Sequence, residues 1–335
     1  MPTPPSALPE LRWFNAADVE AAMPPLEERL RLAEVTLTAF ARPGAAELPP
    51  KIAIHPRPEA SFVHAMPAHL RGTDTADLVG MKWVAGYATN TALGLPGISA
   101  LVIVNDPDTG IPTAILDGGP ITAQRTAAVS GVAIRRFGPA QPAGLDVALI
   151  GTGVQGRSHL PVLAHLLPGA TLHIYDASRS RADAFAGDAR AQEGIARVVV
   201  HDTAREAIEP AAVVVTAAAF GPPEDRQPMT NDWLRPDATV VPIDYDTYCA
   251  ASVARDAALF LVDQREQFLA TRDGGYFAGY PDPGATIGEA IVNGTARPDG
   301  RVVVAHLGVG LADLVFSDAI VRAAIAMGRG AVLSR

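Results

Sequence analysis

The chain has 335 residues, more than one compact core usually holds, so two domains are expected. Its net charge of −9 gives an acidic surface that repels phosphate backbones, which disfavours a nucleic-acid partner. The single cysteine excludes an internal disulfide and a cysteine-based zinc site, and it fits a reducing, cytoplasmic location.

The N-terminal segment is proline-rich and lacks the basic start and apolar run of a signal peptide. No stretch approaches the roughly 18 uninterrupted apolar residues that a membrane-spanning helix needs. The sequence therefore predicts a soluble cytoplasmic protein with no membrane partner.

The first part of the chain predicts helices around an antiparallel sheet. A helix is expected to begin near Ala16 with Asn15 as its N-cap, to keep helical spacing of apolar residues to Leu37, and to stop at residues 42–44. Short strand-like segments separated by turn clusters follow at 51–57, 61–67, 80–84, 100–104 and 113–116. Residues 122–136 are rich in alanine and predict another helix.

From residue 146 the pattern changes to short, β-branched strands that alternate with helices. The strands are expected at 147–150, 171–175, 196–200, 212–216, 239–243 and 259–262, and the helices at 156–167, 180–192 and 203–209. Alternation of this kind gives right-handed crossovers and a parallel sheet. We therefore predict an α/β protein: a doubly wound Rossmann domain at 131–313, and an α+β substrate domain at 1–130 plus 314–335. A last helix, from about 311 to 329, is expected to pack on the substrate domain.

A dinucleotide-binding turn is the strongest motif. Gly151-Thr-Gly-Val-Gln-Gly156 directly follows the strand 147–150 and opens a helix, which is the context that this pattern requires. Gly151 permits the tight turn, Gly153 lets the backbone approach a pyrophosphate, and Gly156 lets the helix pack on the strand. The pyrophosphate is then bound by free N–H groups at the start of the helix.

Asp176 follows the next strand, twenty residues beyond Gly156. A carboxylate there accepts hydrogen bonds from ribose hydroxyls and repels a 2′-phosphate, which favours NAD. Arg179 and Arg181 lie close by and could bind a 2′-phosphate, or they could be solvated residues at the start of a helix. NADP is therefore the alternative cofactor. The segment 216–219 lines the adenine or nicotinamide side, or merely packs there. The expected cofactor-binding residues are Thr126, Gly151, Thr152, Gly153, Val154, Gln155, Gly156, Asp176, Arg179, Thr216 and Ala217.

Two cations stand out in the other domain. Lys82 is flanked by apolar residues, where burial of a charge would be costly, and Arg125 lies in a segment of small residues that is otherwise almost apolar. Either residue alone is more often a structural cation than a ligand. Met66-Pro-Ala lies upstream of both.

Together these motifs resemble the ornithine cyclodeaminase/μ-crystallin family, over about residues 48–332. The pieces that carry the resemblance are Met66-Pro-Ala, Lys82-Trp-Val, Thr122-Ala-Gln-Arg-Thr-Ala-Ala, Ile150-Gly-Thr-Gly-Val-Gln-Gly and Leu307-Gly-Val-Gly-Leu-Ala-Asp. The resemblance implies a homodimer whose substrate domains meet through their sheets, with each active site in an interdomain cleft. It also implies hydride transfer between the nicotinamide and the Cα of a small amino or imino acid.

The resemblance assigns roles to the cations. Arg125 binds the substrate carboxylate through a bidentate fork. Lys82 adds a second charge or handles a proton, and burial beside Arg125 lowers its pKa. Met66 is expected to contact the substrate, and the resemblance implies a further basic residue before it. Either Lys51 or Arg57 could be this residue, and Lys51 is favoured because it follows two prolines.

An acid is expected after the strand 239–243, to hold the substrate amino group and act as base. Asp244 fits best by its distance from the strand, and Asp246 is the alternative. Similar cyclodeaminases continue with Pro-Gly-Lys, whereas this chain continues Tyr-Asp-Thr-Tyr-Cys. This difference favours an imine reductase or an amino acid dehydrogenase over cyclodeamination with catalytic NAD. A non-catalytic, crystallin-like binder of NAD(P) is the alternative from another class.

Two other features have simple interpretations. The spacing of His55, His64 and His69 matches no common metal-ligand pattern, so we expect no metal site. The glycine- and aromatic-rich stretch 272–280 predicts an ordered surface loop, with a substrate lid as the alternative.

Overall fold

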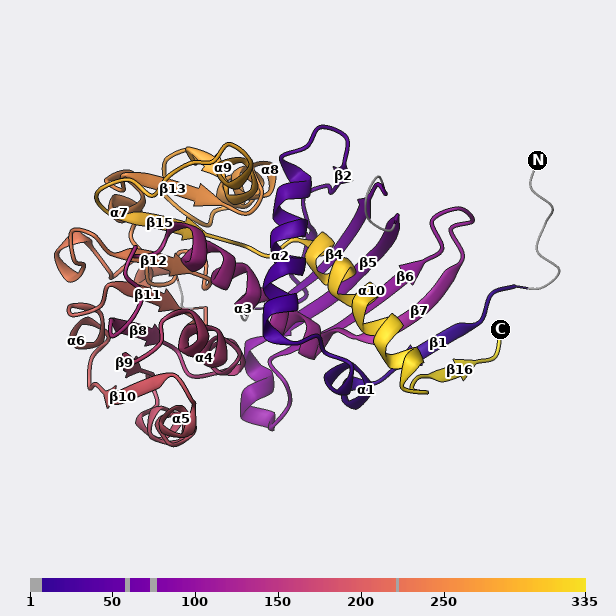
Figure 1. Ribbon diagram of the computed structural model, residues 1–335, viewed down its shortest axis with the longest axis horizontal. Helices are drawn as coiled ribbons and strands as arrows, with labels where there is room; N and C mark the ends of the chain where they lie inside the picture. The colour runs from indigo at the N-terminus through magenta and orange to yellow at the C-terminus, as the bar shows by residue number, and fades with distance from the viewer. Residues whose placement is uncertain (1–7, 58–60, 73–76, 221–222) are drawn as a thin grey trace. The chain divides into compact units, whose positions relative to one another are not determined.

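The computed structural model describes residues 8–57, 61–72, 77–220 and 223–335, and the start of the proline-rich lead lies outside them. The chain forms two compact units (Figure 1). The first comprises Met1–Leu32, Arg42–Arg125 and Val309–Arg335, and the second comprises Ala33–Ala41 and Thr126–Gly308. The sequence placed these limits a few residues later, at 130 and 313.

The first unit contains an eight-stranded sheet in the order β16-β1-β7-β6-β5-β4-β2, with β3 also paired to β4. The predicted strands β4, β5, β6 and β7 are neighbours and antiparallel, as expected. Three very short strands, β1, β2 and β16, were not predicted. The bounds are β1 Leu11–Phe14, β2 Ala46–Glu47, β3 Ile52–Ile54, β4 Ser61–Leu70, β5 Leu78–Tyr87, β6 Ile98–Asn105, β7 Pro112–Asp117 and β16 Ala331–Leu333.

Helix α10 (Gly310–Ala326) covers one face of this sheet and packs on β4, β5 and β6 (Figure 1). Alternate residues of β5 are accordingly buried, whereas the residues between them are less buried or exposed. The helix begins very close to β4, since a Cβ at Gly310 would lie 2.6 Å from the carbonyl oxygen of Met66. This face of the sheet therefore meets the first turn of α10.

The sequence predicted one N-terminal helix, and this prediction is wrong because the structure has two. Asn15 is the expected N-cap, and its side chain accepts a hydrogen bond from the Asp18 amide, but α1 ends at Ala21. A second helix, α2, runs from Leu26 to Phe40. Pro24 and Pro25 separate the two helices because proline cannot continue the hydrogen-bonding pattern of a helix interior.

The second unit contains an eight-stranded sheet, parallel throughout, in the order β10-β9-β8-β11-β12-β15-β13-β14. Its six predicted strands are present, and β14 and β15 were not predicted. The bounds are β8 Asp146–Ile150, β9 Ala170–Tyr175, β10 Ile195–Val200, β11 Val213–Thr216, β12 Thr239–Pro242, β13 Leu259–Val262, β14 Ala285–Thr286 and β15 Val302–Ala305. The reversal of strand order at β8 and β11 is the arrangement of a Rossmann sheet, as predicted.

Helices cover the strands of this unit, and α3 crosses the limit between the two units. Their bounds are α3 Gly118–Phe137, α4 Val154–Leu166, α5 Arg179–Ala191, α6 Ala204–Ile208, α7 Ala251–Arg255, α8 Arg265–Asp273 and α9 Ile287–Val292, with short 3-10 turns at Ala88–Leu93, Pro223–Asp225 and Asn231–Trp233. No helix in the described part of the chain is long and apolar enough to cross a bilayer.

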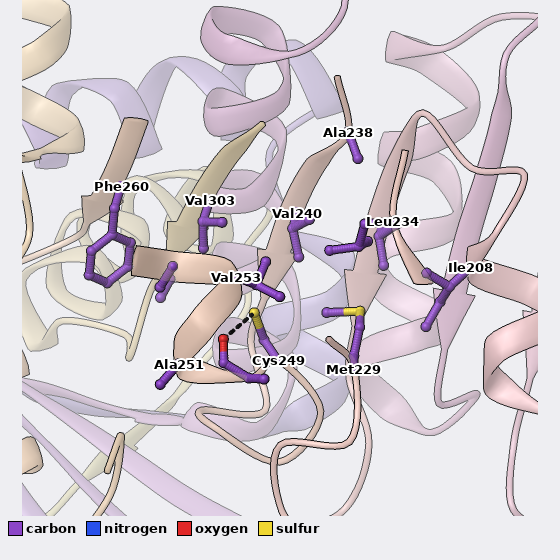
Figure 2. Packing of buried hydrophobic residues seen from close by; sticks show 14 of the residues in the cluster. Ile208, Met229, Leu234, Ala238, Val240, Cys249, Ala251, Val253, Phe260 and Val303 are labelled. Atoms are coloured by element: carbon purple, nitrogen blue, oxygen red, sulfur yellow. Dashed lines mark hydrogen bonds between the residues drawn. The ribbon is translucent and has the colours of Figure 1, made fainter. Parts of the chain in front are cut away.

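Both faces of the parallel sheet are buried, which explains its continuous apolar strands. Val147 and Leu149 of β8 face one apolar cluster, and Ala148 and Ile150 face the other. Figure 2 shows the second cluster, where residues such as Val240 of β12 and Val303 of β15 pack near Met229, Cys249 and Val253.

The aromatic part of the stretch 272–280 belongs to this second cluster. Phe277 is 0% exposed and Tyr280 is 4% exposed, and the Tyr280 hydroxyl donates a hydrogen bond of 2.6 Å to the Cys249 carbonyl oxygen. The prediction of a surface loop or a lid is therefore wrong for these residues. Their apolar rings fill the core instead.

Candidate functional site

The glycine-rich turn of the second unit has the geometry that a pyrophosphate needs. Gly151 has φ +94°, and a Cβ there would lie 2.4 Å from the Ala217 carbonyl oxygen. A Cβ at Gly156 would lie 2.2 Å from the Gly151 carbonyl oxygen. At Gly153, the N-cap of α4, a Cβ would meet nothing within 4 Å. The chain's own packing thus requires two of the glycines, and the third leaves open space beside the first N–H groups of α4.

Asp176 directly follows β9 and is held against this turn. Its Oδ2 accepts hydrogen bonds from the amide and the hydroxyl of Thr152 at 2.9 and 2.8 Å. Its Oδ1 accepts from the Ser178 amide at 2.8 Å and from Arg181 Nη2 at 2.7 Å. Burial opposes ionisation of Asp176, but these donors outweigh it and lower its pKa. A carboxylate is therefore fixed where ribose hydroxyls would be bound.

Of the two arginines near Asp176, the structure brings only Arg181 to the carboxylate. Arg179 forms ion pairs with Asp183 and Asp202 on the surface of the second unit. Thr126, also predicted to bind cofactor, is buried in α3 directly after Arg125. The predicted residues at the end of β11 lie close to the turn, since Ala217 contacts Gly151.

Asp244 lies just beyond β12 and is bonded to the end of β11. The Thr216 hydroxyl donates to its Oδ1 at 2.7 Å, and the Ala218 amide donates to its Oδ2 at 3.1 Å. Burial raises the pKa of Asp244 to about 7; the two donors oppose the rise, and the charge of Asp246 adds to it. A group with this pKa exchanges protons readily near neutral pH.

Asp246, the alternative acid, is also buried but has other neighbours. Its Oδ2 accepts a hydrogen bond from the Phe277 amide at 2.9 Å, and its Oδ1 lies 3.7 Å from Arg226 Nη1. The structure therefore separates the two carboxylates by their contacts, with Asp244 at the strand ends and Asp246 among the loops.

The first unit buries a cluster of charges between β5, α3 and α10. Lys82 lies opposite Met66 of β4, and its Nζ is 2.6 Å from Asp313 Oδ2. Arg125 Nε donates to Asp313 Oδ1 at 3.2 Å. The three charged side chains are at most 6% exposed. Lys82 and Arg125 are thus brought together as predicted, through a shared carboxylate that the sequence did not assign.

Positive charge exceeds negative charge in this cluster. Burial lowers the pKa of Lys82 to about 7; Asp313 opposes this effect, and Arg125 and Lys51 reinforce it. Burial, together with Lys51, His55 and Lys82, lowers the pKa of His64 to about 3, so its ring is neutral. Lys82 and Arg125 thus share the single carboxylate of Asp313, and the charge of Lys51 also acts on Lys82, which favours an anionic ligand.

Of the two candidates for the third cation, only Lys51 lies with this cluster. It directly precedes β3, whose first residue, Ile52, pairs with Ala65 beside Met66. The Arg57 amide instead donates to the Ser61 hydroxyl, at the opposite end of β4. Ser61 pairs with Tyr87 of β5, five residues from Lys82.

A buried polar chain beside the dinucleotide turn was also missed. His159 Nδ1 lies 2.7 Å from the Gln155 carbonyl oxygen, and its Nε2 lies 2.8 Å from Ser130 Oγ, which is 2.8 Å from His306 Nε2. Burial lowers the pKa of His159 to about 4. Because a carbonyl only accepts, neutral His159 donates from Nδ1 and accepts from Ser130, which in turn accepts from His306. This row of hydrogen-bonded side chains joins α3 and the end of β15 to the first turn of α4.

Neither Asp313 nor the polar row of Ser130, His159 and His306 had a strong signal in the sequence. Asp313 ends the segment 307–313 and is an acid in an apolar helix start, but its partners are 188 and 231 residues away along the chain. Ser130, His159 and His306 are single polar residues in apolar surroundings with no common spacing. Only the fold brings such residues together.

The three histidines of the first unit have separate neighbours. His55 Nδ1 lies 2.9 Å from the Ser61 carbonyl oxygen, His69 pairs with Asp77 at 2.7 Å, and His64 stacks on Phe62. Within the described ranges, no three His, Cys, Asp or Glu residues are arranged to hold a metal ion.

The buried Asp244 predicts a pH dependence of stability that does not rely on any activity. Because its pKa is raised from 3.8 to about 7, the unfolded chain releases a proton between these values that the folded chain retains. Rising pH therefore destabilises the wild type in this window, whereas Asp244→Asn lacks this contribution. We expect the free energy of unfolding of wild type relative to the variant to fall by about 4 kcal/mol from pH 4 to pH 8. Urea denaturation of both proteins measures it, and parallel pH curves would contradict it.

Comparison with known proteins places the chain in a family. The model of the ornithine cyclodeaminase/mu-crystallin family matches residues 15–312, which confirms the resemblance drawn from the motifs. The nodulation efficiency protein NfeD of Rhizobium meliloti is 33% identical, covering 97% of this chain and 98% of its own. Delta(1)-pyrroline-2-carboxylate reductase 2 of Burkholderia ambifaria is 31% identical over 75% of each chain.

Solved structures have the same fold. The Thermococcus litoralis Delta(1)-pyrroline-2-carboxylate reductase in complex with NADH and L-proline has a TM-score of 0.83 at 23% identity, covering 96% of this chain and 100% of its own. An archaeal alanine dehydrogenase dimer with bound NAD has a TM-score of 0.79 at 24% identity, covering 97% and 99%. The predicted Rossmann-type α/β fold is confirmed.

Proposed function

Because the chain belongs to the ornithine cyclodeaminase/mu-crystallin family of NAD(P)-dependent reductases and cyclodeaminases, we propose that it is an NAD-dependent oxidoreductase. Its reaction is hydride transfer at the Cα–N bond of a small amino or imino acid. The observation that carries this proposal is the buried excess of positive charge around Asp313. A non-catalytic binder of dinucleotide alone has no use for that charge.

The cations of the first unit bind the substrate carboxylate in this proposal. Arg125 supplies a planar fork that suits a carboxylate, and Lys82 and Lys51 add point charges. Asp313 balances part of this charge and fixes Lys82 and Arg125 relative to each other. A bound carboxylate offsets the buried positive charge of Lys82 and Arg125 that Asp313 balances only in part.

The second unit holds the dinucleotide. The open position at Gly153 and the first N–H groups of α4 receive the pyrophosphate, and Asp176 receives the ribose hydroxyls. The negative charge of Asp176 disfavours a 2′-phosphate, so NAD is preferred over NADP. When bound, the nicotinamide would supply the hydride acceptor for oxidation and, in its reduced form, the hydride donor for reduction.

Asp244 exchanges the proton that accompanies the hydride. Reduction of an imine adds a hydride at carbon and a proton at nitrogen, and oxidation removes both. With a pKa of about 7, Asp244 is present in both protonation states at neutral pH and serves either direction. Thr216 and the Ala218 amide hold its carboxyl group in place.

The segment after Asp244 favours reduction or dehydrogenation over cyclodeamination. The family resemblance implies Pro-Gly-Lys at this place in a cyclodeaminase, whereas this chain has Tyr245-Asp-Thr-Tyr-Cys. The Burkholderia relative supports this choice, since its name describes the reduction of a cyclic imino acid.

Stoichiometry of the cofactor tests the proposal. Purified protein is mixed with NADH or NADPH and cyclic imino acids, or with 2-oxo acids plus ammonia, and separately with NAD and amino acids. We expect the absorbance of NADH to fall in proportion to the imino acid consumed. Product formed with only catalytic NAD would indicate cyclodeamination instead, and no turnover across the panel would contradict the enzyme proposal.

The single cysteine, buried and reduced, also fits a reducing compartment, and we place the reaction in the cytoplasm.

A homodimer is part of the proposal, because one face of the first unit's sheet is apolar and exposed. Ile52, Ile54, Trp83 and Leu101 are 64%, 57%, 45% and 40% exposed. Trp83 pairs with Leu101 and with Ala65, which pairs with Ile52, so the set shares the face opposite Lys82 and α10. Exposed apolar patches on a sheet mark interaction sites. The archaeal relative, a dimer by its description, supports a second copy as the partner.

Leu101→Asp is expected to convert the dimer into a monomer, because the substitution buries a charge in the apolar interface. Ile325→Asp is the matched control, since Ile325 is 48% exposed on α10 rather than on the sheet face. Light scattering after size exclusion measures both masses. A wild-type monomer, or a dimer that survives Leu101→Asp, would contradict this interface.

A further inference from the structure

Three residues other than glycine adopt a left-handed backbone in the described part of the chain. They are Gln227 at φ 65°, Tyr245 at φ 59° and Phe277 at φ 55°. Such conformations are strained for residues that carry a side chain, and they persist only where neighbouring contacts enforce them. The three come from distant parts of the chain, yet all lie around the carboxylate of Asp246.

Asp246 makes the contacts that join these segments. Its Oδ2 accepts a hydrogen bond from the Phe277 amide at 2.9 Å and lies 3.5 Å from Gln227 Nε2. Gln227 Nε2 also donates to the Ala278 carbonyl oxygen at 3.1 Å, and its Oε1 accepts from the Ala251 amide at 2.9 Å. Tyr245 is the preceding residue of the chain, so one buried carboxylate borders all three strained positions.

The ring of Tyr245 is fixed from several sides. It stacks on Phe277 with centroids 5.6 Å apart, and it meets Tyr276 and Phe220 edge to face with centroids 5.5 and 5.1 Å apart. Arg226, the ion-pair partner of Asp246, lies over the Tyr276 ring at 4.6 Å. The backbone between Asp244 and Asp246 therefore has little freedom.

We propose that Asp246 is a positioning residue, which holds Tyr245 and Phe277 in their left-handed conformations and so fixes Asp244 against the end of β11. The proposal rests on the proposed function, in which Asp244 exchanges the proton. Without Asp246, Tyr245 relaxes toward negative φ, and the carboxyl group of Asp244 turns away from Thr216 and the Ala218 amide.

The electrostatic surroundings of Asp244 give a readout that a purely structural role would not move. Tyr248, Cys249 and Tyr280 each interact electrostatically with Asp244, and burial raises the pKa values of Tyr248 and Cys249 to about 12 and that of Tyr280 well above 10. These groups are neutral between pH 5 and 9. After burial, the charge of Asp246 is what raises the pKa of Asp244, and Asp246→Asn removes this charge.

Four variants of the full chain test the proposal: Asp246→Ala, Asp246→Asn, Asp244→Asn and the exposed control Asp237→Asn. For each, kcat and KM for a cyclic imino acid are measured from pH 5 to 9, with the dissociation constant of NADH and the thermal midpoint. A misplacement of about 1 Å costs on the order of 100-fold in rate. We expect a loss of this size in kcat for Asp246→Ala, with KM and NADH affinity within about twofold of wild type.

Asp246→Asn keeps an oxygen that accepts from the Phe277 amide, so we expect it to restore most of kcat. Because it removes a negative charge beside Asp244, we also expect its kcat profile to shift to lower pH. Wild-type kcat in Asp246→Ala would overturn the positioning role, as would an Asp246→Asn variant that loses the pH dependence as Asp244→Asn does.

The result for Asp244→Asn separates the two proposals. If this variant keeps wild-type kcat and pH dependence, the proposed function fails at Asp244, and the positioning role falls with it. If Asp244→Asn is inactive and Asp246→Ala is fully active, only the positioning role fails. Weaker NADH binding together with a lower thermal midpoint in both Asp246 variants would show that the carboxylate is needed for folding. This result would also overturn the positioning role.

Discussion

Arg125→Ala is expected to lower kcat/KM for the imino acid by about 100- to 1,000-fold and to leave NADH affinity within about twofold, as for loss of a buried, charge-paired contact. Arg125 is buried in the first unit, whereas the dinucleotide turn and Asp176 lie in the second. The loss follows because the fork that binds the carboxylate disappears. Asp313 is left with one cation in place of two.

The same variant should also change the titration of Lys82. Burial lowers the pKa of Lys82 most, and charge repulsion from Arg125 adds to this effect, so removal of Arg125 raises that pKa part of the way toward the ordinary value of 10.5. We expect any limb of the pH–rate profile that belongs to Lys82 to move to higher pH.

Steady-state kinetics and NADH titration by fluorescence measure the effects of Arg125→Ala. The matched control is Arg71→Ala, because Arg71 lies in the same unit but forms an exposed ion pair with Glu47 and should be neutral. Equal losses of substrate and NADH binding in Arg125→Ala would mean that Arg125 supports the fold instead.

The sequence predicted features whose residues are contiguous. The turn 151–156 lies directly between a strand and a helix, so six neighbouring residues are enough to identify it. The parallel strands were predictable because burial on both faces imposes continuous apolar runs. β15 has such a run, Val302–Ala305, but it inserts between β12 and β13, and chain order alone does not reveal that place.

What the sequence missed depends on contacts between distant segments. Asp313 reaches Lys82 and Arg125 only because α10 returns to the first unit's sheet. Asp244 and Asp246 are two residues apart and chemically alike, and only their partners, Thr216 and Phe277, separate them. The aromatic residues of 272–280 suggested a loop because glycines surround them, yet the rings of Phe277 and Tyr280 complete the core. In each case, tertiary packing determined the role of a residue that the local sequence pattern could not assign.

Gly153→Asp is expected to abolish most NADH binding while the fold stays as stable as wild type. Gly153 is the N-cap of α4 with φ −71°, a conformation that aspartate adopts readily and in which it caps a helix well. Its side chain enters space where nothing lies within 4 Å, so the protein itself offers no clash. The same space must receive the pyrophosphate, and placing like charges together costs several kcal/mol. We therefore expect NADH to bind at least about 100-fold more weakly.

Three further variants separate charge, bulk and folding. Gly153→Asn is an equally good cap without the charge, so we expect it to weaken NADH binding less than Gly153→Asp does. Gly187→Asp places the same charge in α5, where nothing lies within 4 Å, and should leave affinity unchanged. Gly156→Ala forces a Cβ to 2.2 Å from the Gly151 carbonyl oxygen and should lower both affinity and thermal midpoint. If Gly153→Asp bound NADH like wild type, the pyrophosphate would have to lie elsewhere, because a carboxylate and a diphosphate cannot share the start of one helix at neutral pH.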